Sequence, residues 1–143
     1  MLTVLIDYAA GNLHSAEKAF QRMARETDAG EVIVSGKAED VARADRIVLP
    51  GDGAFPACRR ALVARTGLYE AMVEAVEAKG RPFLGICVGT QMLFDASDED
   101  PDARGLGIIP GTVRWIPPGV KRPQMQWNRL DLRLADDPML RWL

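Results

Sequence analysis

The sequence contains few cysteines, a single histidine and no long apolar run, and each shortage excludes a class of protein. Its two cysteines, Cys58 and Cys87, do not make a disulfide framework and lack the clustered spacing of a zinc site. No stretch approaches the roughly 18 apolar residues that a membrane span requires. No basic segment precedes the first apolar stretch, as a secretory signal would need. We therefore expect a cytoplasmic protein with two reduced thiols and no metal or cofactor.

An excess of positive charge is also missing. The net charge is −2 and no basic block is present, which removes the electrostatic attraction that dominates nucleic-acid binding. The composition, with 48% hydrophobic and 27% charged residues, is instead that of a globular chain. Its 143 residues suit one domain with a sizeable core. We expect neither nucleic acid nor membrane as a partner.

Short β-favouring runs alternate with helical periods along most of the chain. The runs are apolar, as strands buried on both faces of a parallel sheet are. Asn12 can cap the first helix, and Gly80 can end a later one. The expected strands are residues 3–6, 31–35, 46–49 and 83–86. This order predicts an α/β fold with a mostly parallel sheet and helices on both faces.

The pattern changes after Gly89. Residues 95–102 hold several acidic side chains and a proline, which predicts a solvated loop. Residues 112–116 and 129–134 alternate apolar and polar side chains, as half-exposed antiparallel strands do. A new apolar pattern begins at residues 139–142 without continuing. We therefore expect one domain over residues 1–143 that is incomplete at its C-terminus.

The strongest local motif is a cysteine between two glycines, Gly85-Ile86-Cys87-Val88-Gly89. This spacing, between a predicted strand and a predicted helix, allows a sharp turn that presents the cysteine outward, as the G-x-S-x-G elbow presents serine. The positive end of the following helix would favour the Cys87 thiolate, and the Val88 amide would face an oxyanion. The alternative is an inert buried cysteine, which is common in proteins.

A second glycine-rich turn, Pro50-Gly51-Asp52-Gly53, follows the predicted strand at residues 46–49. In a parallel sheet it lies at the same carboxyl edge as Cys87, where ligands bind. Its backbone amides can complete an oxyanion hole. The other interpretation is a tight connection without further function.

Five blocks in this order resemble one family. They are residues 7–15 (DYAAGNLHS), 49–55 (LPGDGAF), 85–94 (GICVGTQMLF), 105–113 (GLGIIPGTV) and 127–128 (WN). Together they are similar to the glutaminase subunits of imidazole glycerol phosphate synthases, which are class I glutamine amidotransferases of histidine biosynthesis. The resemblance covers nearly the whole chain and implies a flavodoxin-like fold.

The resemblance implies a role for each matching position. Cys87 matches the nucleophile that attacks the glutamine carboxamide, releases ammonia and leaves a glutamyl thioester for water to hydrolyse. Val88 and Asp52 match the residues whose backbone N–H groups form the oxyanion hole. Gly51 and Gly53 match the glycines that let the second turn reorient. Gln91 and Glu99 match positions that hold the glutamine.

The resemblance also implies a partner. In this family ammonia passes to a cyclase subunit, a β/α barrel, in a heterodimer. Trp127 and Asn128 match the surface that meets that barrel, and Asn12 is a further candidate. From the residues alone, Trp127 would be interpreted as a strand aromatic packed on the core.

Four side chains depart from the family pattern. Ala9 stands where the family has glycine, and Asp52 where it has an apolar residue. A carboxylate at Asp52 leaves the backbone donor in place. Gln124 and Gln126 replace a histidine and a glycine of the family, which changes the loop that precedes Trp127.

One departure concerns the catalytic machinery. The family completes its cysteine nucleophile with a base and an orienting carboxylate in an H-x-E arrangement near the C-terminus. The single histidine here, His14, lies in the N-terminal block and does not match that position. Three readings follow: a glutaminase subunit represented by a shortened chain, a non-catalytic amidotransferase-like binding module, or an unrelated α/β thiol hydrolase that shares only the Cys87 turn.

Overall fold

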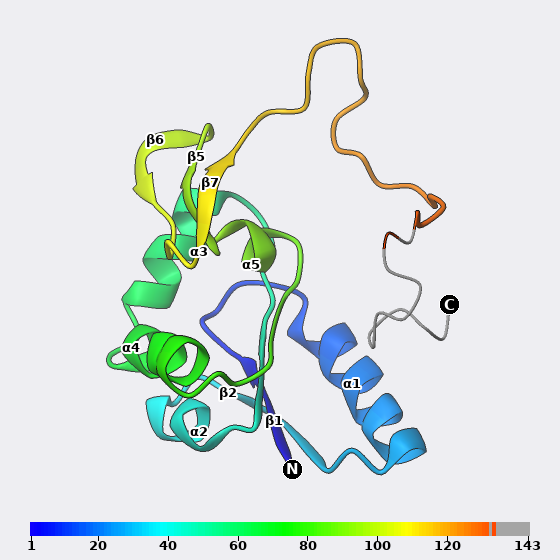
Figure 1. Ribbon diagram of the computed structural model, residues 1–143, viewed down its shortest axis with the longest axis vertical. Helices are drawn as coiled ribbons and strands as arrows, with labels where there is room; N and C mark the ends of the chain where they lie inside the picture. The colour runs from blue at the N-terminus through cyan, green and yellow to red at the C-terminus, as the bar shows by residue number, and fades with distance from the viewer. Residues whose placement is uncertain (132, 134–143) are drawn as a thin grey trace.

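A computed structural model describes residues 1–131 and 133 of the chain. Its centre is a four-stranded sheet, sheet A, in which every neighbouring pair of strands is parallel (Figure 1). The spatial order is β2-β1-β3-β4, and the bounds are Leu2–Ile6 for β1, Glu31–Ser35 for β2, Arg46–Leu49 for β3 and Phe83–Gly85 for β4. All four predicted strands are confirmed, and β2 and β3 have the predicted bounds.

Helices flank both faces of sheet A, as predicted. α1 (Leu13–Thr27) lies on one side, and α2 and α4 lie on the other (Figure 1). The helices after α1 are α2 (Ala38–Arg43), α3 (Phe55–Val63), α4 (Leu68–Val73) and η1 (Glu74–Ala78), a π-helical segment that continues α4. Asn12 caps α1 by accepting a hydrogen bond from the Ser15 amide at 3.3 Å. Within residues 1–131 and 133, no helix is long and apolar enough to cross a bilayer.

The main core lies between sheet A and the helices α2 to α4. Alternate strand residues point to this side because successive side chains of a strand face opposite ways. The strand residues of this layer are Val4, Ile6, Ile47 and Leu49, and the helices add Leu62, Leu68 and Met72. All seven are at most 1% exposed. Since burying one such side chain contributes about 1.5–3 kcal/mol, this layer supplies much of the stability.

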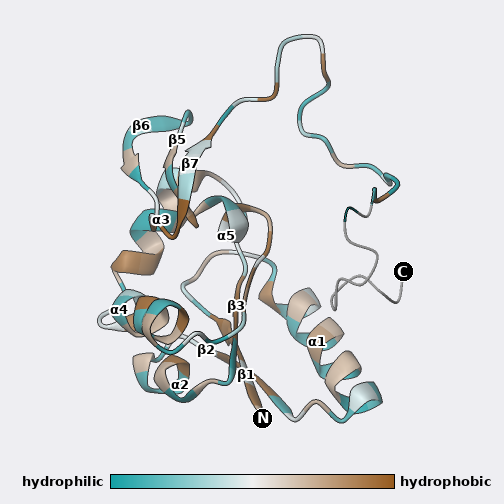
Figure 2. Ribbon diagram, viewed as in Figure 1, coloured by the Kyte–Doolittle hydropathy of each residue, from teal (hydrophilic) through white to brown (hydrophobic). Residues whose placement is uncertain are grey.

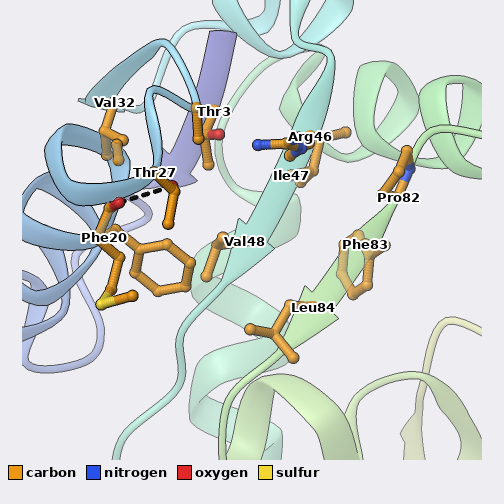
Figure 3. Close-up of a pocket in the computed structure, with 13 residues that line it drawn as sticks. Thr3, Phe20, Thr27, Val32, Arg46, Ile47, Val48, Pro82, Phe83 and Leu84 are labelled. Carbon is orange, nitrogen blue, oxygen red and sulfur yellow. Dashed lines mark hydrogen bonds between the residues drawn. The ribbon is translucent and has the colours of Figure 1, made fainter. Parts of the chain in front are cut away.

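The opposite face of sheet A carries an apolar cavity of about 440 Å³ beside α1. Figure 3 shows Phe20 of α1 pointing toward Val48 of β3, with Phe83 and Leu84 of β4 forming the far wall. Leu84 is 41% exposed, although β4 belongs to a parallel sheet, a kind normally covered on both faces. In Figure 2 the central strands of sheet A carry the hydrophobic colour. The cavity does not include Cys87.

A second, three-stranded sheet, sheet B, corrects the prediction of an acidic loop. Its strands are β5 (Phe94–Ser97), β6 (Asp100–Arg104) and β7 (Ile109–Val113), in the spatial order β6-β5-β7. β5 and β6 form an antiparallel pair over the residues expected to be a solvated loop. Cross-strand hydrogen bonds of a hairpin stabilise this segment despite its charge, because alternate side chains of a strand can remain in solvent.

The strand expected at residues 112–116 is wrong in its bounds and its direction. β7 ends at Val113 and pairs with β5 in parallel, not antiparallel. Pro110 and Gly111 disfavour a strand by propensity, but the Gly111 amide donates to the Asp95 carboxylate at 2.8 Å and holds β7 against β5. The strand expected at 129–134 is absent at residues 129–131 and 133. Residues 132 and 134–143, including the apolar pattern at 139–142, lie outside the described residues.

Candidate active site

Two turns meet at the carboxyl edge of sheet A. Leu49 ends β3 and Gly85 ends β4, and the two residues are paired in register. The Ile86 amide donates to the Leu49 carbonyl at 3.0 Å, so the chain leaves both strands side by side. The Pro50–Gly53 turn and the Cys87 turn are therefore neighbours, as the sequence predicts for two turns at one edge of a parallel sheet.

Cys87 occupies a strained backbone conformation at the centre of its turn. Its φ is +54° and its ψ is −118°, which a side chain with a Cβ rarely adopts. The side chain is exposed, and the turn is closed by hydrogen bonds from the Gly89 amide to Ile86 and from the Thr90 amide to Cys87, at 3.0 and 2.9 Å. This geometry is that of a nucleophile elbow between a strand and a helix.

The flanking glycines of the Cys87 turn are required by close packing. A Cβ on Gly85 would lie 2.6 Å from the Thr90 backbone, and a Cβ on Gly89 would lie 1.9 Å from the Leu49 carbonyl oxygen. Both distances are shorter than any real carbon contact. Gly85 thus lets the Cys87 turn fold back on its own strand, and Gly89 lets it approach the end of β3. The spacing that the sequence shows is thus a packing requirement.

The helix after Cys87 is short. α5 spans Val88–Gln91, a single turn with Cys87 as its N-cap. Because a helix dipole grows by the alignment of successive peptides, one turn supplies little of the expected stabilisation of a Cys87 thiolate. The turn does place the Val88 amide next to the thiol in the chain, where the elbow geometry directs an oxyanion donor.

The Pro50–Gly53 turn packs directly on the Cys87 turn. A Cβ on Gly51 would lie 2.4 Å from the Gly89 amide nitrogen, so only glycine fits. Gly53 has φ +97° with open space around it, so its requirement is conformational. Asp52, between them, is exposed to solvent. Asp52 directly follows Gly51, the residue that packs on the Cys87 turn.

A cavity of about 550 Å³ opens beside Cys87 and contains the predicted Gln91 and Glu99. The Gln91 side-chain oxygen is buried and has no hydrogen-bond partner among the described residues. One Glu99 carboxylate oxygen accepts from the Phe55 amide at 2.9 Å, at the first residue of α3. The cavity is thus lined by a thiol, an amide side chain and a carboxylate.

The cavity also contains side chains that the sequence analysis did not single out. Trp115 and Arg122 are among its lining residues, with the guanidinium 5.7 Å from the ring centroid. The indole N–H of Trp115 donates to the Asp98 carbonyl at 3.3 Å. The sequence pattern predicts Trp115 in a strand at residues 112–116. In the structure β7 ends at Val113, so Trp115 lies beyond the strand.

The three predicted partner-contact residues do not line the cavity. Asn12 caps α1. Trp127 and Asn128 belong to residues 114–131, which hold no helix or strand and form the extended segment after β7 in Figure 1. The Trp127 side chain is fully exposed, so its interpretation as a core aromatic is wrong. His14 is exposed in the first turn of α1 and is not among the cavity residues that the structure describes.

Comparisons with known proteins identify relatives along nearly the whole chain. It is 61% identical over 138 residues to the imidazole glycerol phosphate synthase subunit HisH of Ruegeria pomeroyi, covering 94% of this chain and 65% of that protein. It is 62% identical over 133 residues to HisH of Cereibacter sphaeroides, covering 91% and 63%. It is 47% identical over 144 residues to HisH of Rhodospirillum rubrum, covering 98% and 67%. No family model matches the chain.

The chain belongs to the HisH family. It spans about 65% of the length of the first of these relatives and 63% of the second. The family resemblance inferred from the five sequence blocks is confirmed, as is the mostly parallel α/β fold with helices on both faces. In HisH terms, the Cys87 turn, the Pro50–Gly53 turn and the cavity beside them form the candidate active site.

Proposed function

We propose that the chain is the glutaminase part of an imidazole glycerol phosphate synthase, which hydrolyses glutamine to glutamate and ammonia. One observation carries the proposal: in a chain of the HisH family, the strained Cys87 elbow packs on the Pro50–Gly53 turn and opens into a cavity with Gln91 and Glu99. A positioned thiol beside backbone donors is the arrangement that acyl transfer from an amide requires.

The reaction begins at the Cys87 sulfur. The thiolate attacks the carboxamide carbon, the carbonyl oxygen becomes an oxyanion, and the backbone N–H groups of Val88 and Asp52 stabilise it. Collapse of the tetrahedral intermediate breaks the C–N bond, and ammonia leaves once its nitrogen has accepted a proton. Water then attacks the glutamyl thioester and releases glutamate and the Cys87 thiol.

The cavity suits the amino-acid end of glutamine. We assign Gln91 and Glu99 of its lining to the α-ammonium group, because an amide oxygen accepts a hydrogen bond and a carboxylate supplies a charge of opposite sign. Gly51 and Gly53 give the neighbouring turn the backbone freedom to direct its amides toward the substrate. These residues bind and orient glutamine in front of Cys87.

The ammonia acceptor is a cyclase subunit, a β/α barrel, which joins this chain in a cytoplasmic heterodimer of histidine biosynthesis. The exposed Trp127 side chain supports a contact surface in its segment, because aromatic residues are enriched at protein interfaces. Asn128, next to Trp127 in the chain, and Asn12 at the start of α1 are the other residues that we assign to the partner contact. Two glutamines shape the loop before Trp127. The Gln124 side-chain amide donates a hydrogen bond to the Lys121 carbonyl at 2.8 Å, and that of Gln126 donates one to the Asn128 side-chain oxygen at 3.2 Å.

The proton donor for ammonia comes from outside residues 1–143 in this proposal. His14 is the single histidine of the sequence and does not line the cavity among the described residues. General acid–base assistance is worth roughly 10² to 10⁴ in rate, so its absence leaves little turnover. We propose that these residues form one domain whose H-x-E base and carboxylate lie in a further C-terminal part.

The position of His14 also favours a second candidate function, a non-catalytic amidotransferase-like module that binds the barrel partner. The two candidates differ in whether Cys87 is chemically engaged by glutamine. In the module, the elbow would be a packing feature and the cavity would have no preference for glutamine. In the glutaminase, Cys87 reacts selectively even where turnover is slow.

Glutamate production with and without the cyclase subunit tests the proposal. Residues 1–143 mixed with the partner should form glutamate no faster than the Cys87→Ala variant. A version extended through an H-x-E segment should recover Cys87-dependent, partner-stimulated ammonia release. Robust activity from residues 1–143 alone would show that the base is misassigned, and an extended version without Cys87-dependent activity would favour the binding module.

A further inference from the structure

Two buried side chains that the proposed chemistry does not use hold the Pro50–Gly53 turn from the core side. The Tyr8 hydroxyl donates to the Pro50 carbonyl at 2.5 Å. The Cys58 thiol donates to the Asp52 carbonyl at 3.2 Å. Both side chains are 1% exposed and belong to the main core, so their positions are fixed by packing.

Each of these hydrogen bonds fixes a whole peptide plane. A carbonyl and the N–H of the next residue lie in one rigid plane, so holding the Pro50 oxygen also orients the Gly51 amide. Holding the Asp52 oxygen orients the Gly53 amide in the same way. The peptide between them, which joins the Gly51 carbonyl to the Asp52 amide, has no hydrogen-bond partner within residues 1–131 and 133.

The unheld peptide carries the N–H group that the proposed mechanism needs. Rotating it changes ψ of Gly51 and φ of Asp52, and Gly51 has no Cβ to hinder the change on its side. The Asp52 side chain is exposed and does not oppose such a rotation. The turn is therefore rigid on both sides of one movable donor.

Tyr8 keeps its proton under ordinary conditions. Burial raises the pKa of its hydroxyl well above the usual range, and the neighbouring Cys58 thiol raises the pKa further. A neutral hydroxyl is the form that can donate to the Pro50 carbonyl. The contact is thus maintained across the pH range in which a thiol attacks an amide.

We propose that Tyr8 and Cys58 are positioning residues that clamp the turn on either side of the Gly51–Asp52 peptide, so that this peptide alone rotates to present the Asp52 amide to the oxyanion. The inference rests on the proposed function for its catalytic meaning, while the clamp itself is a property of the turn. Loss of either contact should weaken binding of a tetrahedral adduct and leave the binding of glutamine unchanged.

The glutamine analogue with an aldehyde in place of its carboxamide separates these two effects. Its carbonyl carbon bonds to the Cys87 sulfur, the C=O π bond breaks, and the thiol proton is transferred to the oxygen. The resulting thiohemiacetal places an oxygen where the oxyanion would form. Calorimetry on the 143-residue chain should compare the affinities for this aldehyde and for glutamine.

Tyr8→Phe should weaken aldehyde binding about 3- to 10-fold, the worth of one hydrogen bond, with glutamine affinity within about 2-fold of the wild type. Cys58→Ala should do the same, whereas Cys58→Ser keeps a donor and should restore the wild-type value. Tyr69→Phe, which removes a hydroxyl elsewhere, and Val41→Ala, which trims the same core, serve as matched controls. Equal losses for both ligands, or losses matched by the controls, would overturn the proposal.

A second measurement does not depend on glutamine chemistry. ¹⁵N relaxation dispersion should detect conformational exchange at the Asp52 amide in the wild type. This exchange should extend to the Gly51 amide in Tyr8→Phe and to the Gly53 amide in Cys58→Ala. Unchanged dispersion in both variants would overturn the clamp. If the aldehyde binds the wild type no better than Cys87→Ala, the proposed function fails, and the dispersion pattern alone then decides whether the clamp exists.

Discussion

The main-chain amide of Phe55 donates a hydrogen bond to the carboxylate of Glu99, with 2.9 Å between nitrogen and oxygen. Phe55 begins α3, two residues after the Pro50–Gly53 turn, and Glu99 lies in the hairpin between β5 and β6. The contact therefore joins sheet B to the turn that we propose to carry an oxyanion donor. It gives Glu99 a structural role in addition to its proposed contact with glutamine.

These two roles can be separated by substitution. Glu99→Gln keeps an oxygen acceptor for the Phe55 amide but loses the charge, so glutamine affinity should fall about 10-fold while unfolding free energy changes by less than about 1 kcal/mol. Glu99→Ala should lose affinity and also about 1 kcal/mol or more of stability. Calorimetry and urea unfolding measure the two effects.

Asp102→Asn is the matched control for Glu99→Gln. It removes an exposed carboxylate from the same hairpin, at a position that does not line the cavity. Its glutamine affinity should equal that of the wild type. If Glu99→Gln binds glutamine as tightly as this control does, Glu99 serves the fold alone.

The close approach of the two turns predicts the effect of a methyl group at Gly89. A Cβ there meets the Leu49 carbonyl oxygen at 1.9 Å, so Gly89→Ala must separate β3 from the Cys87 turn. We expect a loss of about 1–3 kcal/mol in unfolding free energy from overpacking, measured by urea denaturation. Glutamine protection of the Cys87 thiol should be lost as well.

Gly80→Ala provides the comparison for Gly89→Ala. Gly80 has φ +61° and open space around its Cα, so alanine there costs conformational strain of about 1–2 kcal/mol without a clash. Glutamine protection of Cys87 should remain as in the wild type. A Gly89→Ala variant that also retains that protection would show that the turns need not touch.

Tyr8 predicts a loss of stability in alkali. Burial raises the pKa of its hydroxyl in the folded state above the unfolded value of 10.0, so unfolding above pH 10 releases a proton. Stability is therefore fully present below that pH and falls above it, by at most about 1.4 kcal/mol per pH unit. Tyr8→Phe should remove this component of the fall, and Tyr69→Phe should keep it. Urea unfolding between pH 9 and 11 would detect the difference, and parallel curves for wild type and Tyr8→Phe would contradict it.

The central sheet was predictable because its signals are local. Apolar β-branched runs and the turns after them placed β2 and β3 at their observed bounds. Sheet B was not predictable in the same way. β6 contains Pro101 and three charged side chains, so its strand structure depends on pairing with β5 and not on its own propensity.

The two turns of the candidate site were predictable from the spacing of their glycines. The glycines around Cys87 and in the Pro50–Gly53 turn carry a pattern that the sequence shows directly, and the paired ends of β3 and β4 bring the turns together. The contacts of Tyr8 and Glu99 could not be inferred, because they join residues 42 and 44 positions apart. Contacts of this kind follow from the packed fold.

Covalent labelling of the 143-residue chain by a glutamine-shaped electrophile tests whether Cys87 is the nucleophile of a glutamine site. Cys87 is exposed and Cys58 is buried, so selectivity for Cys87 alone would reflect access to solvent. The decisive quantity is protection, measured by peptide mass spectrometry against a small neutral alkylating agent as the control. We expect a single adduct on Cys87 whose formation free glutamine slows, and a smaller effect of glutamine on the reaction with the control agent. Labelling of Cys58 at an equal rate, or labelling of Cys87 that glutamine does not slow, would contradict it.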